Sequence, residues 1–136
     1  VALAVGLDLT DRATQSELRA DQLPWAKGKC FRSSAVIGSW SAWSGTWDDL
    51  VGPEQGLHLF LSVNGMERQS SPLSEMSVTP RQQIDALLPW APVAKGDVLF
   101  TGTPQGVGQL HPGDKVVARL TGPNGAELSK IEVSCA

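Results

Sequence analysis

An acidic residue interrupts the apolar beginning of the chain. Asp8 lies between Leu7 and Leu9, in a run where apolar residues alternate with small ones. Burying a carboxylate among aliphatic side chains is costly unless a cation or hydrogen-bond donors meet it. We therefore expect a positive group against Asp8, with the amine of Lys29 close by. The alternative is that Asp8 ends its strand in solvent or caps the following turn.

Two further polar side chains follow at helical spacing. Arg12 and Gln15 are three residues apart, so a helix would place both on one face just beyond Asp8. A guanidinium and an amide in that position could hold the carboxylate or oxo group of a ligand. A solvated polar helix face is the alternative interpretation.

Lys29 has small or apolar neighbours. It follows Gly28 and precedes Cys30 and Phe31, rather than lying in a charged stretch. Burial of a lysine amine is costly but makes it chemically useful, because desolvation changes its proton affinity. Most lysines are only surface charges, so Lys29 indicates a functional site only in combination with the other candidates.

A glycine-rich loop supplies the last candidate. Residues 101–108 contain three glycines and a proline, which let backbone amides and the hydroxyl of Thr101 or Thr103 approach a ligand closely. The loop lacks the Lys-Ser/Thr ending of a P-loop and the spacing of a dinucleotide fingerprint, so nucleotide binding is not indicated. A plain tight turn is the alternative.

The elements that must position these residues are mostly strands. Alternation predicts a strand over residues 1–10, and a polar stretch predicts a helix over 10–20, capped by Thr10. Residues 33–56 are Ser-, Gly- and Trp-rich and predict an irregular connection with a short strand. Asn64-Gly65 between two alternating runs predicts a type I′ hairpin.

The second half of the chain continues this pattern. Thr79-Pro80 followed by Gln82 resembles a capping box and predicts a helix over 80–88. Further strands are expected at 98–100, 115–121 and 127–133, with turns at 112–114 and 122–125. The fold class is therefore α+β, mainly β, with short helices.

Composition bounds the function. The 136 residues suit one domain, 1–136, and 41% apolar with 18% charged residues is ordinary for a globular protein. A net charge of -3 argues against a nucleic-acid partner, and no apolar run approaches the roughly 20 residues of a membrane span. Cys30 and Cys135 are too few for a disulfide framework, so a cytoplasmic location is expected. The chain starts without Met inside an apolar run, from which we expect an incomplete N-terminus.

Four segments together resemble the fumarylacetoacetate hydrolase family in order and spacing: 7–15, 24–31, 63–69 and 101–108. The resemblance implies a mixed β-sandwich roll. It also implies a Mg²⁺ or Mn²⁺ ion held by Asp8 and by two upstream glutamates, which are absent here. By the same resemblance Lys29 is the catalytic lysine, Arg12, Gln15 and Thr103 bind substrate, and the protein is a homodimer.

The chemistry implied by the resemblance is Lewis-acid catalysis on small oxo-acids. Acylpyruvate hydrolysis, oxaloacetate decarboxylation and isomerisation or decarboxylation of hydroxymuconates all fit, and the sequence does not choose among them. The alternative is a catalytically inactive fragment or relative that acts as a dimerisation or binding module. The absent glutamates, and Ala13 where the family usually has aspartate, favour that alternative.

Overall fold

The structure is a computed structural model that describes residues 1–136. Its largest element is a four-stranded antiparallel sheet with strand order β6-β5-β7-β8. The strands are β5 (His58–Val63), β6 (Met66–Pro72), β7 (Lys115–Thr121) and β8 (Glu127–Ser134). The predicted strands at 115–121 and 127–133 are thus confirmed.

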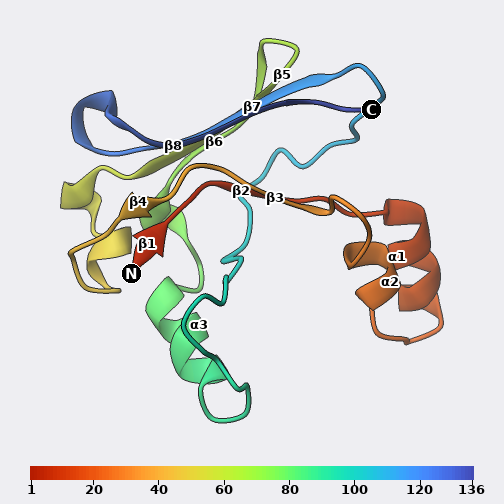
Figure 1. The fold of residues 1–136 in the computed structure, drawn as a ribbon, viewed down its shortest axis with the longest axis horizontal. Coiled ribbons are helices and arrows are strands. Elements are labelled where there is room, and N and C mark those ends of the chain that lie inside the picture. The colour runs from red at the N-terminus through yellow and green to blue at the C-terminus, as the bar shows by residue number, and fades with distance from the viewer.

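A second, thinner layer of strands faces this sheet (Figure 1). It consists of two short antiparallel pairs, β1 with β4 and β2 with β3. Their bounds are β1 (Ala2–Leu3), β2 (Gly6–Asp8), β3 (Ala35–Ile37) and β4 (Ser41–Ala42). The single strand predicted over residues 1–10 is therefore split in two, and the Ser-rich segment contributes two strands where one was expected.

The core lies between the two layers. Seven buried aliphatic residues form it: Val5, Leu7, Val63, Val116, Ala118, Leu120 and Ile131. Ser129 is fully buried among them and ties the layers together. Its hydroxyl accepts a hydrogen bond from the amide of Val5 (3.0 Å) and donates to the carbonyl of Ser39 (2.6 Å). A buried hydroxyl with both roles satisfied fixes the position of the first layer on the sheet.

The helices are short and lie outside the sheets. They are α1 (Arg12–Ala20), α2 (Ala26–Lys29) and α3 (Pro80–Leu87), with single 3₁₀ turns η1 (Asp49–Val51), η2 (Pro53–Gln55), η3 (Leu73–Glu75) and η4 (Pro123–Gly125). α1 and α2 lie together at one end of β2 and β3, and α3 lies below the thinner layer, away from the four-stranded sheet (Figure 1). None of the helices has the length and apolar character that a membrane crossing needs. The α+β, mainly β fold class is confirmed.

Two local predictions are confirmed in detail. Asn64 and Gly65 both have positive φ, 52° and 78°, as a type I′ turn requires. The capping box of α3 is complete, because the Thr79 hydroxyl accepts from the amide of Gln82 and the Gln82 side chain accepts from the amide of Thr79.

The predicted cap of the first helix is wrong. Asp11, not Thr10, caps α1, and its carboxylate accepts hydrogen bonds from the amide and the hydroxyl of Thr14 (3.1 and 2.7 Å). These two hydrogen bonds hold the pKa of Asp11 below its ordinary value. Thr10 is thereby left to make a different contact, described below.

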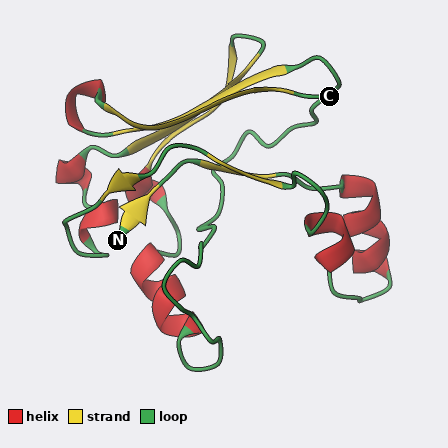
Figure 2. Cartoon of the chain, in the orientation of Figure 1, coloured by secondary structure: helices red, strands yellow, loops and turns green.

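The strand predicted at residues 98–100 is also wrong. This segment belongs to a long irregular stretch between α3 and β7 (Figure 2). No backbone amide or carbonyl of residues 98–108 pairs with another backbone group. Phe100 instead packs on Gly6, where an added Cβ would come within 2.7 Å of the phenyl ring. Within the run 98–100, Phe100 thus contacts β2 through its ring, while Val98 is exposed, and the segment does not pair as a strand.

Candidate active site

A cleft of about 430 Å³ opens between β2, one face of the four-stranded sheet and the loop 100–110. This volume suits a small organic ligand. Four of the five predicted site residues line the cleft: Asp8, Arg12, Lys29 and Thr103. Residues far apart in the sequence are therefore brought to one cavity by the packing of the two layers.

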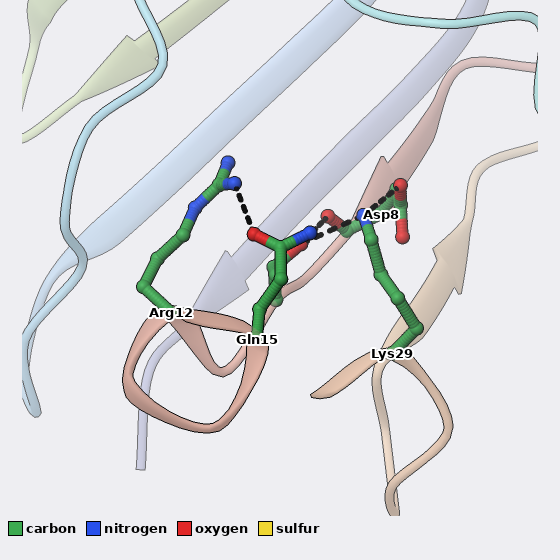
Figure 3. Close-up of polar contacts among 5 residues, drawn as sticks. Asp8, Arg12, Gln15 and Lys29 are labelled. Atoms are coloured by element: carbon green, nitrogen blue, oxygen red, sulfur yellow. Dashed lines mark hydrogen bonds and ion pairs between the residues drawn. The ribbon is translucent and has the colours of Figure 1, made fainter. Parts of the chain in front are cut away.

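Lys29 lies directly against Asp8 (Figure 3). Its Nζ donates to Asp8 Oδ2 at 2.6 Å and to Thr10 Oγ1 at 2.9 Å. The expected positive group beside Asp8 is present. Asp8 is nevertheless not buried: it ends β2, as the alternative interpretation had it, with a side chain 52% exposed, while the Lys29 side chain is 30% exposed.

The contact between α1 and α2 explains how Lys29 reaches Asp8. Gly28 is buried, and an added Cβ there would lie 3.1 to 3.2 Å from backbone and side-chain atoms of Gln15. The Gly28 carbonyl also accepts from the amide of Asp11 at 3.0 Å. Glycine thus lets the short α2 pack closely against the start of α1, and the next residue, Lys29, projects towards the end of β2.

Arg12 and Gln15 interact with each other as their spacing predicts. Arg12 Nη1 donates to Gln15 Oε1 at 2.9 Å (Figure 3). Arg12 lines the cleft, whereas Gln15 does not. Gln15 is therefore placed to orient the guanidinium of Arg12, and the structure does not bring it to the cavity wall.

Thr103 is held on the opposite wall by a residue that the sequence interpretation missed. Gln69 of β6 donates from Nε2 to Thr103 Oγ1 at 2.8 Å and to the carbonyl of Pro104 at 2.9 Å. Gln69 is buried and lines the cleft. A glutamine that alternation places on the inner face of a half-buried strand is the signal that could have indicated it.

Arg68 was also missed. The pairing of β5 with β6 shifts register between Leu61 and Ser62, so that Gln69 faces Leu61, Glu67 faces Ser62, and Arg68 is left opposite no residue. Such a bulge turns side chains relative to a regular strand. Arg68 lines the cleft as a result, and nothing in the sequence alone indicates a bulge at that position.

The charges of the lining favour an anionic ligand. Three cationic side chains, Arg12, Lys29 and Arg68, face the cavity together with the single carboxylate of Asp8. Cationic groups gathered in a cleft with low-dielectric walls attract small anions. A guanidinium can bind a carboxylate through two parallel hydrogen bonds, and a lysine amine can supply positive charge or a proton.

The residues of the chain do not by themselves fit a divalent metal ion. No group of three or more His, Cys, Asp or Glu side chains lies close enough together to hold one. Asp8 is the only carboxylate of the cleft, and its Oδ2 already accepts from Lys29. Mg²⁺ and Mn²⁺ prefer several oxygen ligands, so Asp8 could provide at most a part of such a site.

Comparison with known proteins identifies the relatives of this chain. The family described as "Fumarylacetoacetate (FAA) hydrolase C-terminal" matches residues 1–131. A fumarylpyruvate hydrolase of Ralstonia sp is 35% identical over 88% of this chain and 59% of its own length. An oxaloacetate tautomerase of Escherichia coli (strain K12) is 33% identical over 87% of this chain and 52% of its own length.

Solved structures agree. The fumarylpyruvate hydrolase of Pseudomonas aeruginosa, in complex with Mn²⁺ and pyruvate, superposes with a TM-score of 0.79 at 30% identity, covering 99% of this chain and 55% of that one. A yeast fumarylacetoacetate hydrolase family protein gives a TM-score of 0.82 at 28% identity, covering 97% and 54%. The roll expected from the sequence is thus confirmed.

The chain spans about half the length of the curated relatives it matches. Those relatives are named as hydrolases and tautomerases. The family match covers nearly every residue, from the first strand to the last, including all the residues of the cleft. The chain belongs to the fumarylacetoacetate hydrolase family, a family of enzymes.

Proposed function

We propose that the protein containing these residues is a divalent-metal-dependent enzyme that acts on a small oxo-acid. The reaction would be hydrolysis, decarboxylation or isomerisation at a carbon–carbon bond next to the oxo group. The observation that carries this proposal is the contact of Lys29 Nζ with Asp8 Oδ2 at 2.6 Å, in a cleft that Arg12 and Thr103 also line. The substrates in the names of the relatives, fumarylpyruvate and oxaloacetate, support the same class.

Each residue has a role that follows from its chemistry. Arg12, oriented by Gln15, would bind the carboxylate of the oxo-acid. The Lys29 amine has three N–H donors, two of which are used by Asp8 and Thr10, so that the third can donate to the substrate. Thr103 would donate its hydroxyl hydrogen to a substrate oxygen.

Asp8 would be one ligand of a Mg²⁺ or Mn²⁺ ion. The Mn²⁺ in the structure of the Pseudomonas relative supports a divalent metal in this family. A single carboxylate is a poor site, so the remaining oxygen ligands would have to come from outside these 136 residues. When bound, such an ion supplies Lewis-acid stabilisation of negative charge on the oxo group.

The test is turnover by the whole protein. We expect conversion of oxaloacetate or of an acylpyruvate that requires Mg²⁺ or Mn²⁺ and that stops on addition of a chelator. Lys29→Ala should lower kcat/KM by about 10²- to 10⁴-fold, the usual contribution of a positioned proton donor. Lys27→Ala is the matched control, because Lys27 lies on the same short helix but does not line the cleft.

Two outcomes would contradict the proposal: turnover that is insensitive to metal removal, or a Lys29→Ala protein as active as Lys27→Ala. The inactive binding module is the other candidate, and the single carboxylate is the observation on its side. It predicts that the whole protein shows no Mg²⁺ or Mn²⁺ binding in titration calorimetry. The enzymatic names of the curated relatives do not favour it.

We also propose that residues 1–136 form one domain, and that the protein is a homodimer that works in the cytoplasm. A continuous core that joins the first strands to the last supports the single domain. Twofold dimers are the commonest assemblies of soluble proteins, and family resemblance supports a dimer here. Light scattering on the purified protein measures the assembly, and a monomeric mass would contradict it.

A further inference from the structure

Gln69 connects the sheet to the glycine-rich loop. Its side chain is only 8% exposed, and its Nε2 lies 2.8 Å from Thr103 Oγ1, 2.9 Å from the carbonyl oxygen of Pro104 and 3.4 Å from that of Gln105. A buried amide with three partners in three successive residues is not explained by packing alone. It forms a specific attachment of this loop to β6.

The chemistry of the partners fixes the direction of these hydrogen bonds. Backbone carbonyls of Pro104 and Gln105 can only accept, so the group of Gln69 that faces them must be the amide nitrogen, with its two hydrogens. The same nitrogen donates one hydrogen to Thr103 Oγ1, and the carbonyls of Pro104 and Gln105 share the other. Because the Thr103 oxygen accepts there, its own hydrogen remains free to be donated elsewhere.

The loop depends on such attachments because it has few others. Residues 98–108 make no backbone–backbone hydrogen bond. At Gly106, φ is 99°, and an added Cβ would overlap the carbonyl oxygen of Arg68. Two consecutive residues of β6 thus hold the loop, Arg68 through close backbone packing at Gly106 and Gln69 through its side chain.

We propose that Gln69 is a positioning residue that fixes Thr103 in the cleft and makes its hydroxyl a donor to the bound oxo-acid. The inference rests on the proposed function for its last step. Gln69 donates to one lone pair of Thr103 Oγ1, so the Thr103 hydrogen is turned away from Gln69 and is available to an oxygen of the substrate. The protein thus orients the Thr103 hydroxyl as a donor before the substrate binds, as preorganised donors require.

The first arm of the test concerns the loop and needs no activity. Cleavage by subtilisin within residues 101–108, located by mass spectrometry, is measured in the whole protein and in Gln69→Ala. We expect faster cleavage in the variant, because the side-chain donor that holds the carbonyls of this loop is lost. Gln55→Ala is the control, because Gln55 lies in η2 and does not line the cleft.

The second arm uses a double-mutant cycle on oxaloacetate turnover. Gln69→Ala should lower kcat/KM by about tenfold to a hundredfold, as residues that support a binding group through another residue do. Thr103→Val removes the hydroxyl at similar size. If Gln69 acts through Thr103, the double variant should be no worse than Thr103→Val alone. Gln69→Glu should be as impaired as Gln69→Ala, because a carboxylate accepts from the hydroxyl instead of donating to it.

The outcomes separate the two proposals. A whole protein that turns over no oxo-acid would overturn the proposed function, and the proteolysis arm would still decide whether Gln69 positions the loop. Unchanged cleavage in Gln69→Ala, additive losses in the cycle, or a fully active Gln69→Glu would each overturn the inference. If Gln69→Ala melts below the assay temperature, Gln69→Glu, of matched size, replaces it in both arms.

Discussion

At the scale of single residues, the ion pair of Lys29 and Asp8 is better explained by function than by stability. Both side chains are partly exposed, 30% and 52%, and ion pairs screened by solvent contribute about 0–1 kcal/mol. The contact instead fixes the position of the amine at the wall of the cleft. Thr10, which Asp11 frees from capping the helix, adds a second acceptor for the same amine.

Gly106 is a residue of the loop whose backbone conformation and surroundings leave no room for a side chain. Its φ of 99° disfavours any other residue, and a Cβ would meet the Arg68 carbonyl oxygen. We expect Gly106→Ala to destabilise the protein by about 1–3 kcal/mol, or to displace the loop with loss of ligand binding. Urea unfolding monitored by circular dichroism measures the first effect, and subtilisin cleavage within residues 101–108 measures the second.

Gly108 provides the matched control. It lies two residues further on in the same loop, has no positive φ, and an added Cβ would meet no atom within 4 Å. Gly108→Ala should therefore leave both stability and loop cleavage close to wild type. Equal effects of the two substitutions would show that the strain assigned to Gly106 is absent.

At the scale of elements, local patterns predicted what local contacts determine. The hairpin at Asn64-Gly65 and the capping box at Thr79 depend on residues within three positions of each other, and both formed as expected. The prediction for the cap of α1 was wrong because two adjacent residues, Thr10 and Asp11, could each cap the helix. The distant amine of Lys29 donates to Thr10 instead. Such a choice depends on tertiary contacts that the sequence pattern does not contain.

Asp114 links three elements through its carboxylate. It accepts from the backbone amide of His111 (2.8 Å) and from Asn64 Nδ2 (2.8 Å), while Asn64 Oδ1 accepts from the amide of Lys115. The His111 amide and the Asn64 side chain hold the pKa of Asp114 below its ordinary value. The hairpin turn and the start of β7 are thus joined by a charge-dependent network.

This network predicts a dependence of stability on pH. Because the pKa of Asp114 is lowered on folding, its contribution is fully present above the unfolded value of about 3.9 and is lost as the pH falls through the folded value. Asp114→Asn should be less stable than wild type at pH 7, and the difference should shrink as the pH falls below about 4. Urea midpoints at several pH values measure it.

Asp21→Asn is the control for this series, because the Asp21 carboxylate makes no hydrogen bond or ion pair. The pKa values of Asp11, Asp49 and Glu132 are also lowered, by hydrogen bonds from Thr14, Thr46 and Lys130, so wild type loses stability in acid through several groups. Only the difference in stability between wild type and Asp114→Asn isolates the contribution of Asp114. A difference that persists unchanged at pH 3 would contradict the assignment.

At the scale of the whole molecule, the sequence indicated only part of the cleft. The residues around Asp8 and Lys29 were predicted to meet, and they do. Arg68 could not be assigned, because it lines the cleft through a bulge in β6, and alternation could have placed Gln69 on the inner face but not against a loop that returns across the sheet. The family resemblance identified Thr103, but only the packing of the layers explains what holds it.

The surface of the chain is large for its mass. Its accessible area is 9166 Å², about a third more than the roughly 6,800 Å² of a compact monomer of 14.4 kDa. Only 14 of the 136 residues are buried. Part of this surface lines a wide, mainly apolar groove between β1, α3 and the irregular stretch that follows α3. Stability that depends on buried apolar area is correspondingly small.

We therefore expect the isolated 136-residue chain to bind a hydrophobic dye such as ANS and to unfold at the lower end of the usual range, near or below about 45 °C. Trp40 is 54% exposed and lines the groove, so Trp40→Ser should reduce dye binding. Trp90 is 75% exposed but lies outside the groove, so Trp90→Ser should leave dye binding unchanged. A chain that melts cooperatively above about 65 °C without binding dye would show that the groove is closed in solution.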